Sequence, residues 1–151
     1  MKNYTGNIRP ANDIIFVFGS NPTGWHGAGS ALAAVNMFGA IWGKGEGLQG
    51  NAYGLPTTEL RKDYQVEGYS QSIPEPKIIE SIKRMYECAK KNPDKKFCIA
   101  YRNQPNEVTL CGYAGRQLMD MFKVAAHEMG GYPDNIYFSE EWVNSGCLEL
   151  D

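Results

Sequence analysis

The apolar residues of this chain fall into short continuous runs and into longer stretches with helical spacing. Residues 14–18 (Ile-Ile-Phe-Val-Phe) form one continuous run that ends at Gly19, which is typical of a strand buried on both faces of a largely parallel sheet. The apolar positions with helical spacing that follow are Ala28, Ala31, Leu32, Val35 and Phe38. Gly39 then ends the pattern. The first unit is therefore predicted to be a strand, a glycine-rich loop and a helix.

The rest of the chain continues this alternation. Strands are predicted at residues 52–57, 97–101 and 135–138. A helix is predicted to begin near Pro74 and Pro76, because proline suits the first helical turn. Its apolar positions are Ile78, Ile79, Ile82, Met85, Tyr86 and Ala89, and those of the next helix are Leu118, Phe122, Ala125 and Met129. Strands that alternate with helices predict one α/β domain over residues 1–151, with helices covering a sheet.

The amino-acid composition of the chain limits the kinds of molecule that it is expected to bind. The chain has 151 residues and a formal net charge of −2, which argues against binding to duplex nucleic acid or to an anionic membrane surface. We find neither an apolar run long enough to span a membrane nor the features of a signal peptide, so a cytoplasmic protein is expected. The four cysteines and two histidines are widely spaced, and we therefore expect reduced thiols, no metal site and no cofactor.

Glycine is concentrated in one part of the chain, since ten of the 17 glycines lie between Gly19 and Gly54. A glycine loop between a strand and a helix offers backbone amides and a positive helix end to a phosphate. The nucleotide-binding pattern G-x-x-x-x-G-K-[ST] is absent here, and G-x-G-x-x-G would need glycine at Leu32. The alternative is that these glycines only form turns.

Three stretches, taken together, resemble the macro domain family of ADP-ribose-binding proteins. The first comprises residues 6–8 (Gly-Asn-Ile) and residues 14–21, which end in Gly-Ser-Asn. The second is residues 24–29 (Gly-Trp-His-Gly-Ala-Gly), which open a helix. The third is residues 111–115 (Cys-Gly-Tyr-Ala-Gly), with residues 135–138 as the final strand. More narrowly, FVFGSN…HGAG…GEGLQG…YGLPT is similar to small stand-alone macro-like proteins of bacteria and phages.

The resemblance implies a three-layer α/β/α sandwich with a mixed central sheet. It also implies that the cleft between two glycine-containing loops binds ADP-ribose or a related adenine nucleotide diphosphate. Asn7, Ile8 and Phe138 would contact the adenine, and Asn21 would bind the distal ribose. The remaining residues implied to contact the ligand, chiefly its phosphates, are Ser20, Gly27, Ala28, Gly29, Ser30, Cys111, Gly112, Tyr113 and Ala114.

The sequence departs from the family at several positions that matter for chemistry. Asn7 stands where the family has Asp, and Leu110 stands where related second loops have Gly. Ser30 and Ala31 replace the catalytic Asp of one branch. Another branch pairs a helix Lys with an Asp; here Val35, Asn36 and Met37 occupy the Lys region and Ala114 replaces the Asp. A binding module is therefore the first hypothesis.

Two other functions stay open. One is a hydrolase that cleaves an ADP-ribose linkage or a terminal phosphate, with His26 as acid/base and Asn21 as a further candidate; histidine suits proton transfer near neutral pH. Cys111 as a nucleophile is a weaker form of this hypothesis. The other is a structural or interaction domain that binds no nucleotide. The tryptophans that could wall the cleft are Trp25, Trp42 and Trp142, although packing is the alternative for at least two of them. The sequence does not determine the oligomeric state.

Overall fold

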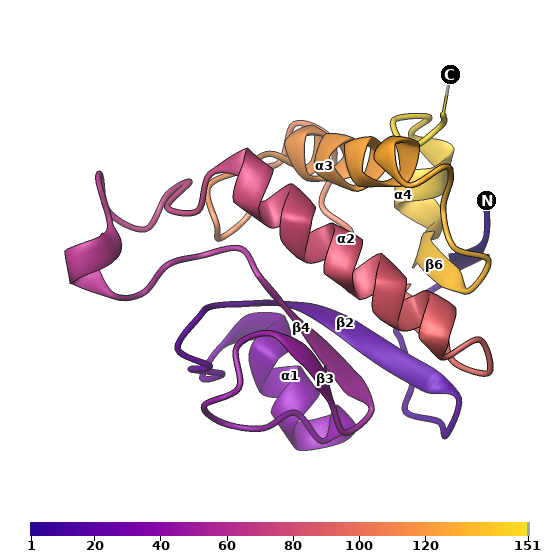
Figure 1. Cartoon of the computed structure of the whole chain (residues 1–151), viewed down its shortest axis with the longest axis horizontal. Helices are drawn as coiled ribbons and strands as arrows, with labels where there is room; N and C mark the ends of the chain where they lie inside the picture. Colours follow the sequence, from indigo (N-terminus) through magenta and orange to yellow (C-terminus); the bar gives the residue numbers. More distant parts are fainter. Residues whose placement is uncertain (151) are drawn as a thin grey trace.

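The computed structural model describes residues 1–150, in which six strands form one sheet in the order β1-β6-β5-β2-β4-β3 (Figure 1). The strands are β1 (Asn3–Tyr4), β2 (Ile14–Ser20), β3 (Gly47–Gln49), β4 (Ala52–Pro56), β5 (Lys96–Ile99) and β6 (Ile136–Ser139). Every pairing is parallel except that of β3 with β4. In the centre, Val17 of β2 lies beside Tyr53 of β4 and Ile99 of β5. The sheet is therefore mixed, as expected.

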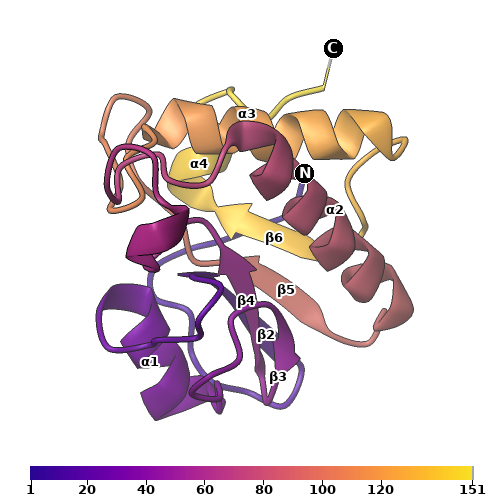
Figure 2. The same ribbon diagram turned by 60° about the vertical axis from the view of Figure 1, so that its left-hand side comes forward.

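Helices cover both faces of this sheet, which confirms the predicted α/β sandwich. They are α1 (Gly29–Phe38), α2 (Glu75–Lys91), α3 (Gly115–Glu128) and α4 (Glu140–Asn144), with one 3-10 turn, η1 (Lys62–Tyr64). Strand β2 explains the layering, because its side chains alternate between the two faces. Ile15 and Val17 join the core under α2 and α3, whereas Phe16 and Phe18 join the core under α1. Figure 2 shows α1 and α2 on opposite sides of the sheet.

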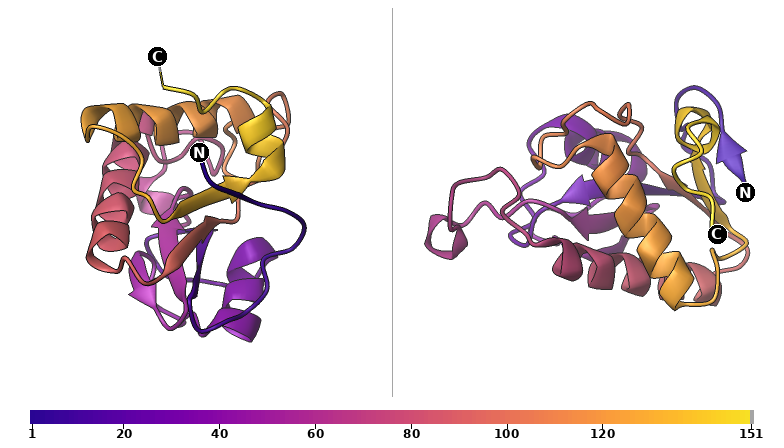
Figure 3. Two further views of the ribbon diagram at one scale, coloured as in Figure 1. Left: turned by 90° about the vertical axis from the view of Figure 1, so that its right-hand side faces the viewer. Right: turned by 90° about the horizontal axis from the view of Figure 1, so that it is seen from above.

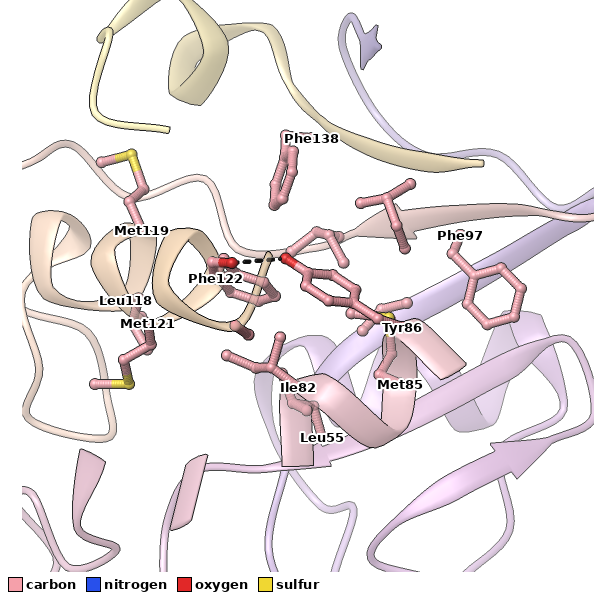
Figure 4. Packing of buried hydrophobic residues seen from close by; sticks show 14 of the residues in the cluster. Leu55, Ile82, Met85, Tyr86, Phe97, Leu118, Met119, Met121, Phe122 and Phe138 are labelled. Carbon is pink, nitrogen blue, oxygen red and sulfur yellow. Dashed lines mark hydrogen bonds between the residues drawn. The ribbon is translucent and has the colours of Figure 1, made fainter. Parts of the chain in front are cut away.

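The larger core lies between the sheet and the paired helices α2 and α3 (Figure 4). The predicted apolar face of α2 is confirmed, since all of its positions are buried except Ile79, which is half-buried. The Tyr86 hydroxyl of α2 donates a hydrogen bond of 2.9 Å to the Phe122 carbonyl of α3. Phe138 and Trp142 pack their rings around Phe122 in the same core. Burial of this aromatic cluster fixes α3 and α4 against β6.

The prediction for the apolar face of α1 was wrong at two positions: Ala28 is the exposed N-cap residue, and Leu32 is 38% exposed. The residues that α1 buries against the sheet are Ala31, Ala34 and Phe38. Small alanines let this short helix approach the sheet closely, so its buried stripe is narrow and Leu32 lies outside it. Strands β1 and β3 and helix α4 were not predicted: the two strands have only two and three residues, and the five residues of α4 cover little more than one helical turn.

Residues 58–72, here called the arm, leave the end of β4 and return to α2. The arm projects from the body of the molecule on the side opposite β6 and the N-terminus (Figure 3). Its two ends are held together, because the Glu59 amide donates a hydrogen bond of 2.7 Å to the Ser72 hydroxyl. Its middle is almost entirely exposed, because residues 61–71 are all exposed except Gln65, which is half-buried. Among residues 1–150, no helix combines the length and apolar character that crossing a membrane requires.

Candidate ligand-binding site

A cavity of about 500 Å³ lies at the carboxyl ends of β2, β4 and β5. Strand β2 is the branch point of the sheet, since the chain continues from β2 to β4 on one side and returns to β5 on the other. Ligands of open α/β sheets bind at this position, because the loops that follow the strands diverge there and leave a crevice. The fold therefore places the cavity where a ligand is expected.

The beginning of helix α1 forms one wall of the cavity. Ala28, Gly29, Ser30 and Ala31 all line it. Ala28 is the N-cap residue, and its methyl group cannot accept a hydrogen bond from the first-turn amides. The first turn also lacks an acidic residue. These amides and the positive end of the helix dipole are therefore available to an anion in the cavity.

The floor of the cavity consists of neutral hydroxyl and thiol groups. The hydroxyls of Thr57 and Tyr101 lie 2.6 Å apart, and the Thr109 hydroxyl lies 2.9 Å from the Cys111 sulfur. Burial raises the pKa of Tyr101 well above its usual range, so its hydroxyl stays protonated at neutral pH. A methyl group on Gly19 would lie 2.2 Å from this hydroxyl. Glycine at this position therefore allows Tyr101 to reach Thr57.

Three exposed apolar side chains surround the cavity mouth. Trp25 is 55% exposed, Tyr69 49% and Leu110 91%, and all three line the cavity. Arg102 is the one charged residue among the lining residues that the structure describes. Its guanidinium donates to the Gly6 carbonyl and to the Glu141 carboxylate at 3.0 and 2.9 Å. Arg102 therefore links the N-terminal segment and α4 to the cavity.

Six of the sequence-predicted residues line the cavity: Ser20, Asn21, Ala28, Gly29, Ser30 and Cys111. The Asn21 side chain also folds the loop itself. Its carbonyl accepts hydrogen bonds from the Trp25 amide at 3.0 Å and the Thr23 hydroxyl at 2.5 Å, and its amide group donates to the Trp25 carbonyl at 2.7 Å. Asn21 thus sets the position of Trp25 at the mouth.

The second predicted loop contributes less than expected, since Gly112, Tyr113 and Ala114 do not line the cavity. The Gly112 amide donates to the Thr109 carbonyl, and the Ala114 amide donates to the Gln117 side chain. The Tyr113 hydroxyl points elsewhere and donates to the Ile73 carbonyl at 2.6 Å. Two of the amides assigned to the phosphates are therefore already hydrogen-bonded within the protein.

The residues predicted to contact the adenine also lie away from the cavity lining. Phe138 is fully buried, and its ring packs against Phe122, Tyr132 and Trp142. Asn7 is exposed, and Ile8 packs on the core under α1. The core already encloses the Phe138 ring, so this ring offers no free face for stacking.

His26 and Gly27 lie behind the cavity wall. His26 is fully buried, its ring meets Phe18 edge to face, and its Nε2 lies 3.0 Å from the Lys44 carbonyl oxygen. Its Nδ1 has no hydrogen-bond partner. A methyl group on Gly27 would collide with the Trp25 ring. The structure therefore does not bring the His26 imidazole to the cavity.

Most of the glycine density serves close contact between loops. A methyl group on Gly45 would lie 2.1 Å from the Asn21 carbonyl oxygen, so residues 43–45 can pack against the 19–29 loop only with glycine there. Within the cavity itself, the lining glycines are Gly19 and Gly29. Loop packing therefore accounts for Gly45, whereas Gly19 and Gly29 lie at the cavity.

Thr57, Tyr69 and Tyr101 were missed by the sequence prediction. Thr57 and Tyr101 end the predicted strands 52–57 and 97–101, and that position alone could have marked them as cavity residues. Tyr69 carries no such signal, because it reaches the cavity from near the C-terminal end of the arm and follows no predicted strand.

No family model matches the chain, and no match was found among the curated proteins or the solved structures. Within residues 1–150 there is no group of three or more His, Cys, Asp or Glu residues placed to hold a metal ion.

Proposed function

We propose that the protein is a member of the macro-like proteins and binds a nucleotide of the ADP-ribose type, with a phosphate at the start of α1. The observation that carries the proposal is the uncapped first turn of α1, which opens into the cavity beside β2. A phosphate needs donors and positive potential, and the first-turn amides and the dipole of α1 supply both; Arg102 is the one cationic residue among the described residues that line the cavity. A net charge of −2 for the whole chain is compatible with this, because backbone amides carry the interaction.

The size and composition of the cavity support the same proposal. About 500 Å³ lies within the usual range for small-ligand sites. The neutral floor of Thr57, Tyr101 and Thr109 suits the hydroxyl groups of a ribose, which both donate and accept hydrogen bonds. No carboxylate lines the described cavity, so none would repel a phosphate.

The residues that line the cavity favour ligand binding over catalytic turnover. Among the described residues, those lining the cavity include no His, Asp, Glu or Lys that could act as a general acid or base. His26, the acid/base of the hydrolase hypothesis, is fully buried behind the wall. The proposal therefore assigns ligand binding and gives His26 no catalytic role.

The test is isothermal titration with ADP-ribose, with ATP and NAD as comparison ligands, on the unmodified protein and on Ser30→Asp. We expect micromolar binding of ADP-ribose and a loss of at least about tenfold in Ser30→Asp, because the new carboxylate occupies the anion position. The same carboxylate should raise the free energy of unfolding by about 0.3–1 kcal/mol, because a negative charge at the N-terminus of a helix interacts favourably with the helix dipole.

Asn36→Asp is the matched control, because it adds the same charge to an exposed position of α1 outside the cavity lining. It should leave ADP-ribose affinity within about twofold of the unmodified protein. Absence of saturable binding at millimolar ADP-ribose, or an equal loss in both variants, would contradict the proposed function.

A further inference from the structure

The base of a bound nucleotide needs a contact other than Phe138. Phe138, the predicted stacking partner, is closed into the core by three aromatic rings. The cavity mouth instead carries Trp25, Tyr69 and Leu110, here called the rim. Single exposed apolar residues are common on protein surfaces. Here three of them, two with large aromatic faces, converge on one opening.

The rim is held together by contacts between segments far apart in the sequence. The arm returns along the 110–112 loop, where the Gln71 amide donates to the Cys111 carbonyl at 2.7 Å and the Gln71 side chain donates to the Gly112 carbonyl at 3.2 Å. A methyl group on Gly29 would lie 3.8 Å from the Leu110 side chain. Tyr69 and Leu110 are therefore held near the start of α1, where the phosphate is proposed to bind.

Trp25 completes the rim from the 19–29 loop. Its main chain is fixed on both sides by the Asn21 side chain, and its ring meets Trp42 edge to face at a centroid distance of 6.3 Å. A ring that is held by its neighbours and is still more than half exposed is prepared for stacking, because little conformational entropy remains to be lost on binding.

We propose that the base of the bound nucleotide stacks on the rim formed by Trp25, Tyr69 and Leu110, with Tyr69 supplied by the arm. This inference rests on the proposed function, which places the phosphate at the start of α1. The ligand then spans from the amides of α1 to the aromatic mouth, and the arm is part of the binding site. Phe138 has only a structural role.

The experiment compares two ligands on matched variants of the arm. ADP-ribose carries a base, whereas ribose 5-phosphate keeps a phosphate and a ribose without one. Tyr69→Ala should weaken ADP-ribose binding about 5- to 100-fold, the usual effect of removing one stacking side chain. It should leave the affinity for ribose 5-phosphate within about twofold, measured by competition or by ligand-observed NMR. Tyr69→Phe, which keeps the ring, should restore ADP-ribose binding.

Tyr64→Ala is the control for effects on the arm as a whole. Tyr64 is exposed on the same arm, with the Arg61 guanidinium 4.1 Å above its ring, and it lies outside the cavity lining. This variant should bind both ligands like the unmodified protein. A second readout is tryptophan fluorescence, which ADP-ribose should quench through Trp25 and ribose 5-phosphate should not.

The outcomes separate this inference from the proposed function. Ser30→Asp should weaken both ligands, whereas Tyr69→Ala should weaken only ADP-ribose. Unchanged ADP-ribose binding in Tyr69→Ala, or equal losses of both ligands in that variant, would overturn the stacking rim and leave the phosphate site intact. Failure of both ligands to bind the unmodified protein would overturn the proposed function and this inference with it.

Discussion

At the scale of single residues, the absence of a side chain at Gly19 determines the shape of the cavity floor. The Tyr101 hydroxyl occupies the space where a Cβ atom of residue 19 would lie, at 2.2 Å. This approach lets Tyr101 contact Thr57 at 2.6 Å across the ends of two strands. Gly19 is therefore required by a neighbouring tyrosine, whereas the glycine density alone suggested either turns or a contact with a ligand.

Gly19→Ala should destabilise the protein by about 1–3 kcal/mol, because the added methyl group forces Tyr101 to move. The measurement is urea-induced unfolding of Gly19→Ala, Tyr101→Phe and the double variant. Removing the hydroxyl relieves the closest contact, so Gly19→Ala should cost at least about 0.5 kcal/mol less in the Tyr101→Phe background. Strict additivity of the two substitutions would contradict the contact.

At the scale of elements, helix α2 shows how the burial of an amphipathic helix face stabilises the fold. Its buried face packs on the sheet and on α3, and Ile82 on that face is fully buried whereas Ile79 is only half-buried. The two isoleucines thus differ in burial and not in chemistry. They form a matched pair for measuring what packing against the larger core contributes.

Ile82→Ala should lower the free energy of unfolding by about 2–5 kcal/mol, through lost burial and the cavity left behind. Ile79→Ala should cost less than about half as much, because solvent already reaches part of that side chain. Chemical denaturation monitored by circular dichroism measures both. Equal losses for the two variants would be inconsistent with the packing of α2.

At the scale of the whole molecule, several tyrosines are buried or half-buried, and their hydroxyls are hydrogen-bonded inside the fold. Tyr4, Tyr86 and Tyr132 donate to the carbonyls of Ile99, Phe122 and Leu148, at 2.6, 2.9 and 2.6 Å. Burial raises the pKa of each well above its usual range. The folded protein therefore holds these protons more tightly than the unfolded chain does.

These tyrosines should therefore leave the free energy of unfolding unchanged below about pH 10, and the free energy of unfolding should fall as the pH rises above 10. The sign follows because the unfolded chain releases the phenol protons first. Each of these three tyrosines contributes a slope of about 1.4 kcal/mol per pH unit. Urea unfolding at a series of alkaline pH values measures this slope, and Tyr86→Phe should reduce it by one such increment. A slope that is unchanged in Tyr86→Phe would contradict the prediction.

The sequence by itself determined the α/β class, the two long helices and the central strand. These follow from local physics, since a buried strand and an amphipathic helix each need a recognisable spacing of apolar residues along the chain. The position of the cavity also follows in part, because loops after parallel strands meet at one edge of the sheet. Short elements such as β1 and α4 carry too few residues to be seen this way.

Only the tertiary structure decided which predicted site residues share the cavity. Phe138 and His26 were predicted as functional, yet both are fully enclosed, and Tyr69 was not predicted, yet it lines the mouth. Burial depends on what other segments pack against a side chain, and those segments come from distant parts of the sequence. A local pattern can place a residue at the end of a strand, but only the packed chain determines whether that residue faces a ligand or the core.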